Sequence, residues 1–386
     1  MLLTPFHWGR LSLLSFSGYE GYDSNPRLQA SGSAASFTEL NALLLFSRRF
    51  AGWQLNLQYQ PFLSFSPKRT NKSFSAVAVD LQTVRHLNRS WSWSASENFR
   101  YSPDVQNAVG TGLVLNSGGG ISIGDTYLSA GRNVLADNVY VGVNDRYSER
   151  SSLAFHIDGN FTRLSSYLGG QSAINLPTEQ AVSYSPGVVW STHLNVRDTL
   201  SLKYDYRVQS ATGTSVGDVN SQTASIGWGH RLKPSVRFSA TFGPGWSKYT
   251  GRQNPATSQP WRSTLQGSLG ISKEFRRGGV ALAFARSNSF SGTIADGFNN
   301  RYDLLLNRSL TPRWSCAASV SYLQQQASRG RNTTGKQASA QLSHFVSRNW
   351  SIFAQARYLK IEGSEQFSSE KIATLGFRWA WEPDRP

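Results

Sequence analysis

The stretch Lys371-Ile372-Ala373-Thr374-Leu375-Gly376-Phe377-Arg378-Trp379-Ala380-Trp381 alternates between two kinds of side chain. Successive side chains of a β-strand point to opposite faces, so one face would carry Ala373, Leu375, Phe377, Trp379 and Trp381. The other face would be mostly small and would carry a single cation, Arg378. The stretch therefore predicts a strand with a continuous apolar face that ends in two tryptophans.

The composition indicates that this apolar face is turned outward. Hydrophobic residues make up 39% of the 386 residues, yet aromatic residues make up 12%. Few aliphatic and many aromatic side chains favour a barrel with a lipid-facing outside and a wet inside over a packed core. No apolar run approaches the length of a transmembrane helix. The single cysteine, Cys316, excludes an internal disulfide.

One unit repeats from Leu11 to Trp381: an alternating segment, a short basic turn, a second segment and a longer polar loop. The expected segments are 11–22, 37–47, 53–65, 73–86, 90–102, 138–148, 151–164, 181–194, 199–209, 221–231, 235–249, 262–275, 279–290, 300–310, 313–325, 336–346, 349–361 and 371–381. Regular alternation of long and short connections is typical of a bacterial outer-membrane barrel, and a β-sandwich does not need it. We therefore predict an all-β fold, a single closed antiparallel transmembrane β-barrel of about 18 strands, with 16 to 20 as the range.

Aromatic residues are expected at both ends of the strands. Tryptophans lie near the short-turn ends, and the predicted membrane girdle there comprises Trp53, Trp91, Trp314, Trp350, Trp379 and Trp381. Tyrosines, such as Tyr59 and Tyr322, lie toward the long-loop ends. Phe353 is an exception, because the alternation places it among polar residues.

The stretch 103–137 is the longest expected loop, the third on the outer side, and it is rich in glycine. Loops of this length are usually functional or disordered. Its apolar pieces 113–115 and 121–123 suggest an extra hairpin. If this hairpin joined the wall, the strand count would be 20.

At this point the chain resembles the outer-membrane β-barrel porin class, over the whole pattern 11–381 and most specifically in the terminal aromatic strand. The opening strand, Gly18-Tyr19-Glu20-Gly21-Tyr22-Asp23-Ser24-Asn25, looks like that of porins associated with exopolysaccharide loci. The resemblance implies that the barrel assembly machinery reads the last strand. The tail 382–386 departs from the class, in which the chain usually ends on an aromatic residue, and residues 1–10 do not read as a signal peptide.

The resemblance also implies that the third loop folds into the lumen and narrows it. The expected constriction residues are Asp104, Asp125 and Arg132. The expected pore-lining residues are Arg100, Arg146, Lys203, Asp205, Arg207, Arg237, Arg357 and Arg378.

The formal net charge is +16, and the basic residues are spread along the chain instead of being clustered, which disfavours a nucleic-acid partner. Cations on a pore wall favour anions. The alternative is that they pair with lumen carboxylates such as Asp80, Asp158, Asp205 and Asp303, or bind lipid headgroups at the rim. With 39 basic and 23 acidic residues, pairing cannot neutralise all the cations.

The sequence holds no HExxH, CxxC or phosphate-binding loop, so we expect no enzyme activity, no metal and no cofactor. One alternative is a hydrolase that uses Ser191 with His193, or His156 with Ser152 and Asp158.

The predicted function is a passive outer-membrane channel for small hydrophilic solutes in a Gram-negative-type bacterium, with a preference for anions. Alternatives are an export conduit for an acidic exopolysaccharide and a structural or adhesive barrel without an open pore. The expected partners are outer-membrane lipids, the barrel assembly machinery, small anionic solutes or acidic polysaccharide, and further copies of the chain.

Overall fold

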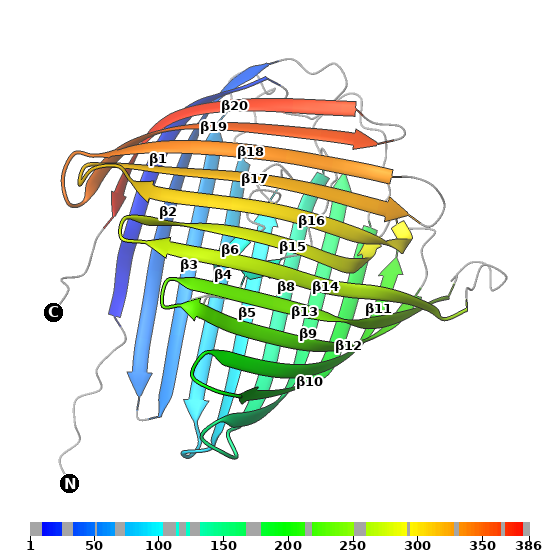
Figure 1. Cartoon of the computed structure of the whole chain (residues 1–386). Helices are drawn as coiled ribbons and strands as arrows, with labels where there is room; N and C mark the ends of the chain where they lie inside the picture. Colours follow the sequence, from blue (N-terminus) through cyan, green and yellow to red (C-terminus); the bar gives the residue numbers. More distant parts are fainter. Residues whose placement is uncertain are drawn as a thin grey trace, which may run out of the picture.

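The computed structural model describes residues 10–24, 34–50, 52–65, 74–102, 113–115, 121–123, 132–166, 179–212, 218–250, 260–291, 294–327, 332–363 and 367–380. Every regular element in these ranges is a β-strand (Figure 1). Within them, no helix is long and apolar enough to cross a membrane.

The first ten strands are β1 Arg10–Asp23, β2 Ala35–Phe50, β3 Trp53–Phe65, β4 Phe74–His86, β5 Trp91–Ser102, β6 Leu113–Leu115, β7 Ile121–Ile123, β8 Arg132–Asp145, β9 Ser151–Ser166 and β10 Glu179–His193. The second ten are β11 Asp198–Thr212, β12 Asp218–Lys233, β13 Val236–Thr250, β14 Arg262–Phe275, β15 Gly278–Ser291, β16 Ile294–Ser309, β17 Trp314–Ala327, β18 Asn332–Phe345, β19 Trp350–Gly363 and β20 Phe367–Ala380.

Eighteen of these strands form one antiparallel sheet that closes on itself. The closure is the pairing of β1 with β20, from Ser15 opposite Ala380 to Asp23 opposite Ile372. In Figure 1 the red β20 accordingly lies beside the blue β1. The predicted fold class and the count of 18 strands are confirmed.

The hairpin in the long third connection does not join the wall. β6 and β7 pair only with each other, in a separate two-stranded sheet. Strand boundaries differ from the predicted ones by up to six residues: residues 132–137, which we expected in the loop, begin β8, and β16 begins at Ile294 instead of residue 300. β8 pairs with β5 on one side and β9 on the other.

The short turns fall at the eight predicted places, and five of them share a local hydrogen-bond pattern. A side-chain oxygen two or three residues before the next strand accepts backbone N–H groups, which is the chemistry of Asx and Ser/Thr turns. Asn88, for example, accepts from Ser90 N and Trp91 N at 2.8 Å each. The other four acceptors are Ser148, Asn195, Thr311 and Ser347. These turns begin strands β5, β17 and β19 on a tryptophan, so they help to place the aromatic girdle.

The barrel is apolar outside and polar inside, which is the reverse of a packed globular domain. On β20, Leu375 is 64% exposed and Phe377 is also exposed, whereas Gly376 between them is buried. The buried apolar side chains among the described residues are only Ala35, Val219, Leu323, Phe353, Leu359 and Ile361. The outward orientation predicted for the apolar face of the last strand is therefore confirmed for residues 373–380, while Trp381 lies outside the described residues.

Candidate functional site

The inner wall of the barrel is the candidate functional site, and much of it is uncharged and polar. On β3 the inward side chains are Gln54, Asn56, Gln58 and Gln60. Neighbouring inward side chains bond across strands: Ser47 to Asn56 at 2.8 Å, and Ser319 to Ser339 at 2.7 Å. Hydroxyl and amide groups of this kind keep spare hydrogen-bonding capacity for water or a polar solute.

Among the described residues, four lysine or arginine side chains of this wall lie in ion pairs with carboxylates. Lys203 Nζ lies 3.0 Å from Asp205 Oδ2, and Arg301 Nε lies 2.8 Å from Asp303 Oδ2, each pair within one strand. The other two pairs join neighbouring strands: Arg237 Nη2 lies 3.4 Å from Glu274 Oε1, and Arg357 Nη2 lies 3.6 Å from Glu370 Oε2. The sequence left open whether wall cations pair with carboxylates, and these four do.

The two members of a pair are not equally accessible. The Lys203 side chain is 45% exposed against 19% for Asp205, and Arg357 is 16% exposed against 0% for Glu370. Arg301 is likewise more exposed than Asp303, and only in the Arg237–Glu274 pair is the carboxylate the more exposed member. In three of the four pairs, the charge nearer the water is therefore positive.

His156 is held between two carboxylates on the wall formed by β8 to β11. Its Nε2 lies 3.0 Å from Asp205 Oδ1 and 3.4 Å from Asp158 Oδ2, and Tyr140 stacks on its ring with centroids 6.0 Å apart. A Cβ added at Gly187 would lie 2.6 Å from His156 Nε2, so glycine leaves room for the ring at this point.

The serine–histidine sets considered for a hydrolase are not brought together here. Ser152 Oγ and Ser191 Oγ bond to each other at 2.9 Å, and His193 Nδ1 bonds to Thr199 Oγ1 at 3.0 Å. The His156 ring nitrogen Nε2 lies against the carboxylates of Asp205 and Asp158. A serine nucleophile needs its base within hydrogen-bond reach. Here the two serine hydroxyls bond to each other and His193 bonds to a threonine.

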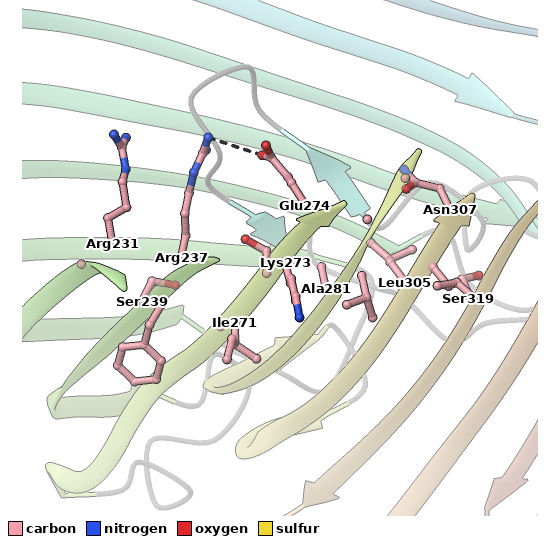
Figure 2. A pocket seen from close by; sticks show the side chains of 18 of the residues that line it. Arg231, Arg237, Ser239, Ile271, Lys273, Glu274, Ala281, Leu305, Asn307 and Ser319 are labelled. Carbon is pink, nitrogen blue, oxygen red and sulfur yellow. Dashed lines mark ion pairs between the residues drawn. The ribbon is translucent and has the colours of Figure 1, made fainter. Parts of the chain in front are cut away.

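A cavity of 870 Å³ runs along the short-turn half of the wall from β11 to β19. Small inward residues, including Ser239, Gly270, Gly279, Ala281 and Ala317, give it a smooth surface. Figure 2 shows Arg231, Arg237 and Glu274 pointing to one side of the sheet, with the ion pair dashed, and Lys273 pointing to the other. Arg231 and Arg237 are therefore cations of this cavity on the lumen side of the sheet.

The wall formed by β19, β20, β1 and β2 is, in contrast, covered by larger side chains. The Tyr19 hydroxyl donates to Glu39 Oε2, and the Tyr19 ring lies edge-on to both Phe37 and Phe353. The guanidinium of Arg378 lies over the Phe353 ring, 5.7 Å from its centroid. The lumen is thus lined by bulky groups on one side and by small groups on the other.

Most of the predicted pore-lining residues take lumen positions. Arg100, Lys203, Asp205, Arg207, Arg237, Arg357 and Arg378 share faces with the inward residues of their neighbouring strands. Arg146 does not: it follows the last residue of β8, and its guanidinium donates to the Glu149 carbonyl at 2.9 Å, within the turn. Asp104 and Asp125 lie outside the described residues, as does the side chain of Arg132, the first residue of β8.

Sequence reasoning did not single out Arg231, Glu274, Arg301, Glu370 or the Tyr19–Glu39 pair. The pairing of Arg301 with Asp303 could have been predicted, because the two residues are two apart and such side chains share a strand face. Glu274 and Glu370 have their cations on neighbouring strands, so only the register of the barrel reveals them.

Five of the six tryptophans predicted for the girdle are described, and they lie near the short-turn ends of their strands. Trp53, Trp91, Trp314 and Trp350 are exposed at the first residues of their strands, and Trp379 lies one residue from the end of β20. Trp190 and Trp228 lie at the same end and were not predicted as girdle residues; their indole N–H groups donate to Tyr147 and Asp198. Amphipathic rings at one level around a closed barrel are typical of a membrane interface.

A closed barrel with an apolar exterior, a polar lumen and aromatic residues near the strand ends is the architecture of a membrane-spanning β-barrel. The chain has the fold of an outer-membrane β-barrel. Barrels of this fold lie in the outer membrane of Gram-negative bacteria, with their short turns on the periplasmic side.

Solved structures with a similar arrangement include OccK2 (OpdF) of Pseudomonas aeruginosa, with a TM-score of 0.47 and 10% identity, covering 95% of this chain and 97% of that one. OccAB4 of Acinetobacter baumannii has a TM-score of 0.45 and 9% identity, covering 98% and 100%. The siderophore receptor PiuA of Acinetobacter baumannii has a TM-score of 0.44 and 7% identity, covering 94% and 82%. No protein-family model and no curated protein matches the chain.

Proposed function

We propose that the protein is a passive channel for small hydrophilic solutes and that it prefers anions. The polar wall supports the first part, because a solute that sheds part of its hydration shell there meets hydroxyl, amide and charged groups. The 870 Å³ cavity, whose lining includes many glycine, alanine and serine residues, supports a lumen with room for a solute.

The observation that carries the anion preference is the unequal exposure within the wall ion pairs. A solute in the lumen interacts most strongly with the charges nearest the water, and in three of four pairs the cation is the more exposed member, most clearly Lys203 at 45%. Arg231 and Arg378 add exposed cations to the same wall. A positive potential lowers the electrostatic barrier for anions and raises it for cations.

The test is conductance of the purified protein in planar bilayers under a KCl gradient. The reversal potential is expected to have the sign of chloride permeability exceeding potassium permeability. A potential of the opposite sign, or the lack of any conductance in bilayers that contain folded protein, would contradict the proposal.

A second measurement in the same bilayers separates small anions from polymers. Sodium glucuronate and polyguluronate are added in turn to the periplasmic side. A channel for small anions continues to conduct in glucuronate. A lumen whose current is blocked by the polymer alone at equal uronate concentration would instead indicate a polyanion conduit.

A further inference from the structure

A cluster of cations and aromatic rings lies on the outward face of the barrel at the short-turn end of β2 to β5. We define the β2–β5 rim cluster as Arg48, Phe50, Trp53, Arg85 and Trp93. Phe50 is opposite Trp53, Trp53 is opposite Arg85, and Arg85 is opposite Trp93, so these four residues form one row across four neighbouring strands. The row lies at the level of the tryptophan girdle and faces the membrane, away from the lumen.

The rings and guanidinium groups of this cluster are in direct contact. The Arg48 guanidinium carbon lies 4.2 Å from the centroid of the Phe50 ring, and that of Arg85 lies 5.8 Å from the Trp53 ring. Trp53 in turn contacts Phe50 and Trp93, with centroids 6.2 and 6.1 Å apart. The Trp53 indole N–H donates to Thr83 Oγ1, which fixes the orientation of the central ring.

Basic residues predominate around this cluster. Residues 46–58 and 81–95, which include both short turns of this region, contain Arg48, Arg49, Arg85 and Arg89 and no aspartate or glutamate. The carboxylate of the next strand on the outward face at this end is Asp145 of β8, which lies opposite Trp91 and not in the row. Elsewhere on the outward rim a carboxylate lies directly on a basic group, since Asp198 Oδ1 is 2.6 Å from His230 Nδ1. The predominance of cations makes the rim cluster suited to an anionic ligand.

We propose that the β2–β5 rim cluster binds the phosphate of an anionic glycerophospholipid in the periplasmic leaflet. A guanidinium that stacks on a ring uses its face, and its N–H donors lie in the plane and point past the ring. These donors suit the oxygens of a phosphodiester. The exposed rings of Phe50 and Trp53 lie beside the glycerol and upper acyl region, which amphipathic aromatic side chains favour.

The position and the charge favour a lipid over a second copy of the chain. In a two-fold symmetric dimer across this patch, the same surface would face itself, and the outward cations Arg48 and Arg85 of each copy would repel those of the other. A lipid of negative charge gains from the same cations, by about fivefold in binding for each one near the membrane surface.

The experiment is a lipid titration of the full chain, purified in detergent, with bound lipids counted by native mass spectrometry. Phosphatidylglycerol is the anionic probe and phosphatidylethanolamine is the probe without net charge. The wild-type protein is expected to prefer phosphatidylglycerol. The variant Arg48→Gln/Arg85→Gln is expected to bind it about 25-fold more weakly, because two cations are lost at about fivefold each.

The matched control is Arg313→Gln/Arg348→Gln, which removes the same charge from two other short turns on the same rim. It is expected to retain most of the binding. The variant Arg48→Lys/Arg85→Lys keeps the charge but not the planar stacked donors, and it is expected to be intermediate. Heat-modifiable mobility on gels shows that each variant is folded, and single-channel conductance should be unchanged because the cluster lies outside the lumen.

Two results would overturn the proposal. One is an equal loss of phosphatidylglycerol binding in the test and control variants, which would mean that the overall charge of the rim attracts the lipid. The other is the loss of a dimer or trimer in Arg48→Gln/Arg85→Gln with lipid binding unchanged, which would assign the cluster to contact between copies.

Discussion

The ring of Phe353 on β19 meets the ring of Tyr19 on β1 edge to face, with centroids 6.0 Å apart and planes at 65°. The strand between them, β20, has Gly376 at the pairing position of both residues. The last strand therefore closes the barrel at a point where it has no side chain, and the rings of its two neighbours meet over it. The seam is held by inward aromatic packing as well as by backbone hydrogen bonds.

Phe353→Ala is expected to destabilise the closed barrel. The side chain is buried and contacts Tyr19 and Arg378, so truncation removes apolar contact and leaves a cavity, at a cost of about 3 kcal/mol. Urea unfolding in phospholipid vesicles measures the loss. Phe345→Ala, at the exposed end of β18, is the control and should cost clearly less. Equal losses of stability in the two variants would show that Phe353 at the seam contributes no more than an exposed phenylalanine.

Gly376→Ala is expected to impair barrel closure more severely than the addition of a methyl group usually does. A Cβ at this position would lie 2.5 Å from the Gly18 carbonyl oxygen and closer still to the Tyr19 Cβ. Backbone atoms of β1 cannot move away without breaking the seam. The matched control is Gly159→Ala on β9, where the nearest atom to the new Cβ is 3.8 Å away. The folded fraction after refolding, read from heat-modifiable gel mobility, should fall only for Gly376→Ala.

The sequence alone predicts the barrel because each strand has one face toward lipid and one toward water. That contrast is strong in β3 and β20, where aromatic and aliphatic residues alternate with amides or small residues. It is weaker near the start of β8, where Asp137 shares a face with Val139 and Val141.

The wall chemistry was predictable only where partners lie in one strand. Lys203 with Asp205 can be recognised at a spacing of two, because such side chains share a face. Arg357 and Glu370 are thirteen residues apart, and what brings them together is the offset of β19 against β20. The register depends on turn lengths and closure of the whole sheet, which no single segment encodes. Phe353 was an exception to the pattern for the same reason, since its partners lie on β20 and β1.

Arg357→Ala is expected to cost more stability than Lys203→Ala, although each removes one cation from a wall ion pair. Removing Arg357 takes a cation from Glu370 at a fully buried position, and breaking a buried pair costs about 3 to 5 kcal/mol. The Lys203–Asp205 pair is more exposed, and such pairs contribute about 1 kcal/mol or less. The double variant Arg357→Ala/Glu370→Ala should recover part of the loss in urea unfolding. No recovery would mean that Arg357 stabilises the barrel through its packing and not through the carboxylate.

Neutralising the cations of the short-turn cavity is expected to weaken the preference for anions. Arg231 and Arg237 point into the lumen, as Figure 2 shows, so Arg231→Gln/Arg237→Gln lowers the positive potential along the solute path. A unit charge at about 4 Å in water contributes about 1 kcal/mol, so each loss should reduce the chloride-to-potassium permeability ratio by at most about fivefold. The control, Lys273→Gln/Arg308→Gln, removes two cations of β14 and β16 that share the outward face of these strands. Reversal potentials under the same KCl gradient should shift toward potassium for the first variant and stay near the wild-type value for the second. A similar shift in both would mean that the overall charge of the barrel, and not its lumen wall, sets the selectivity.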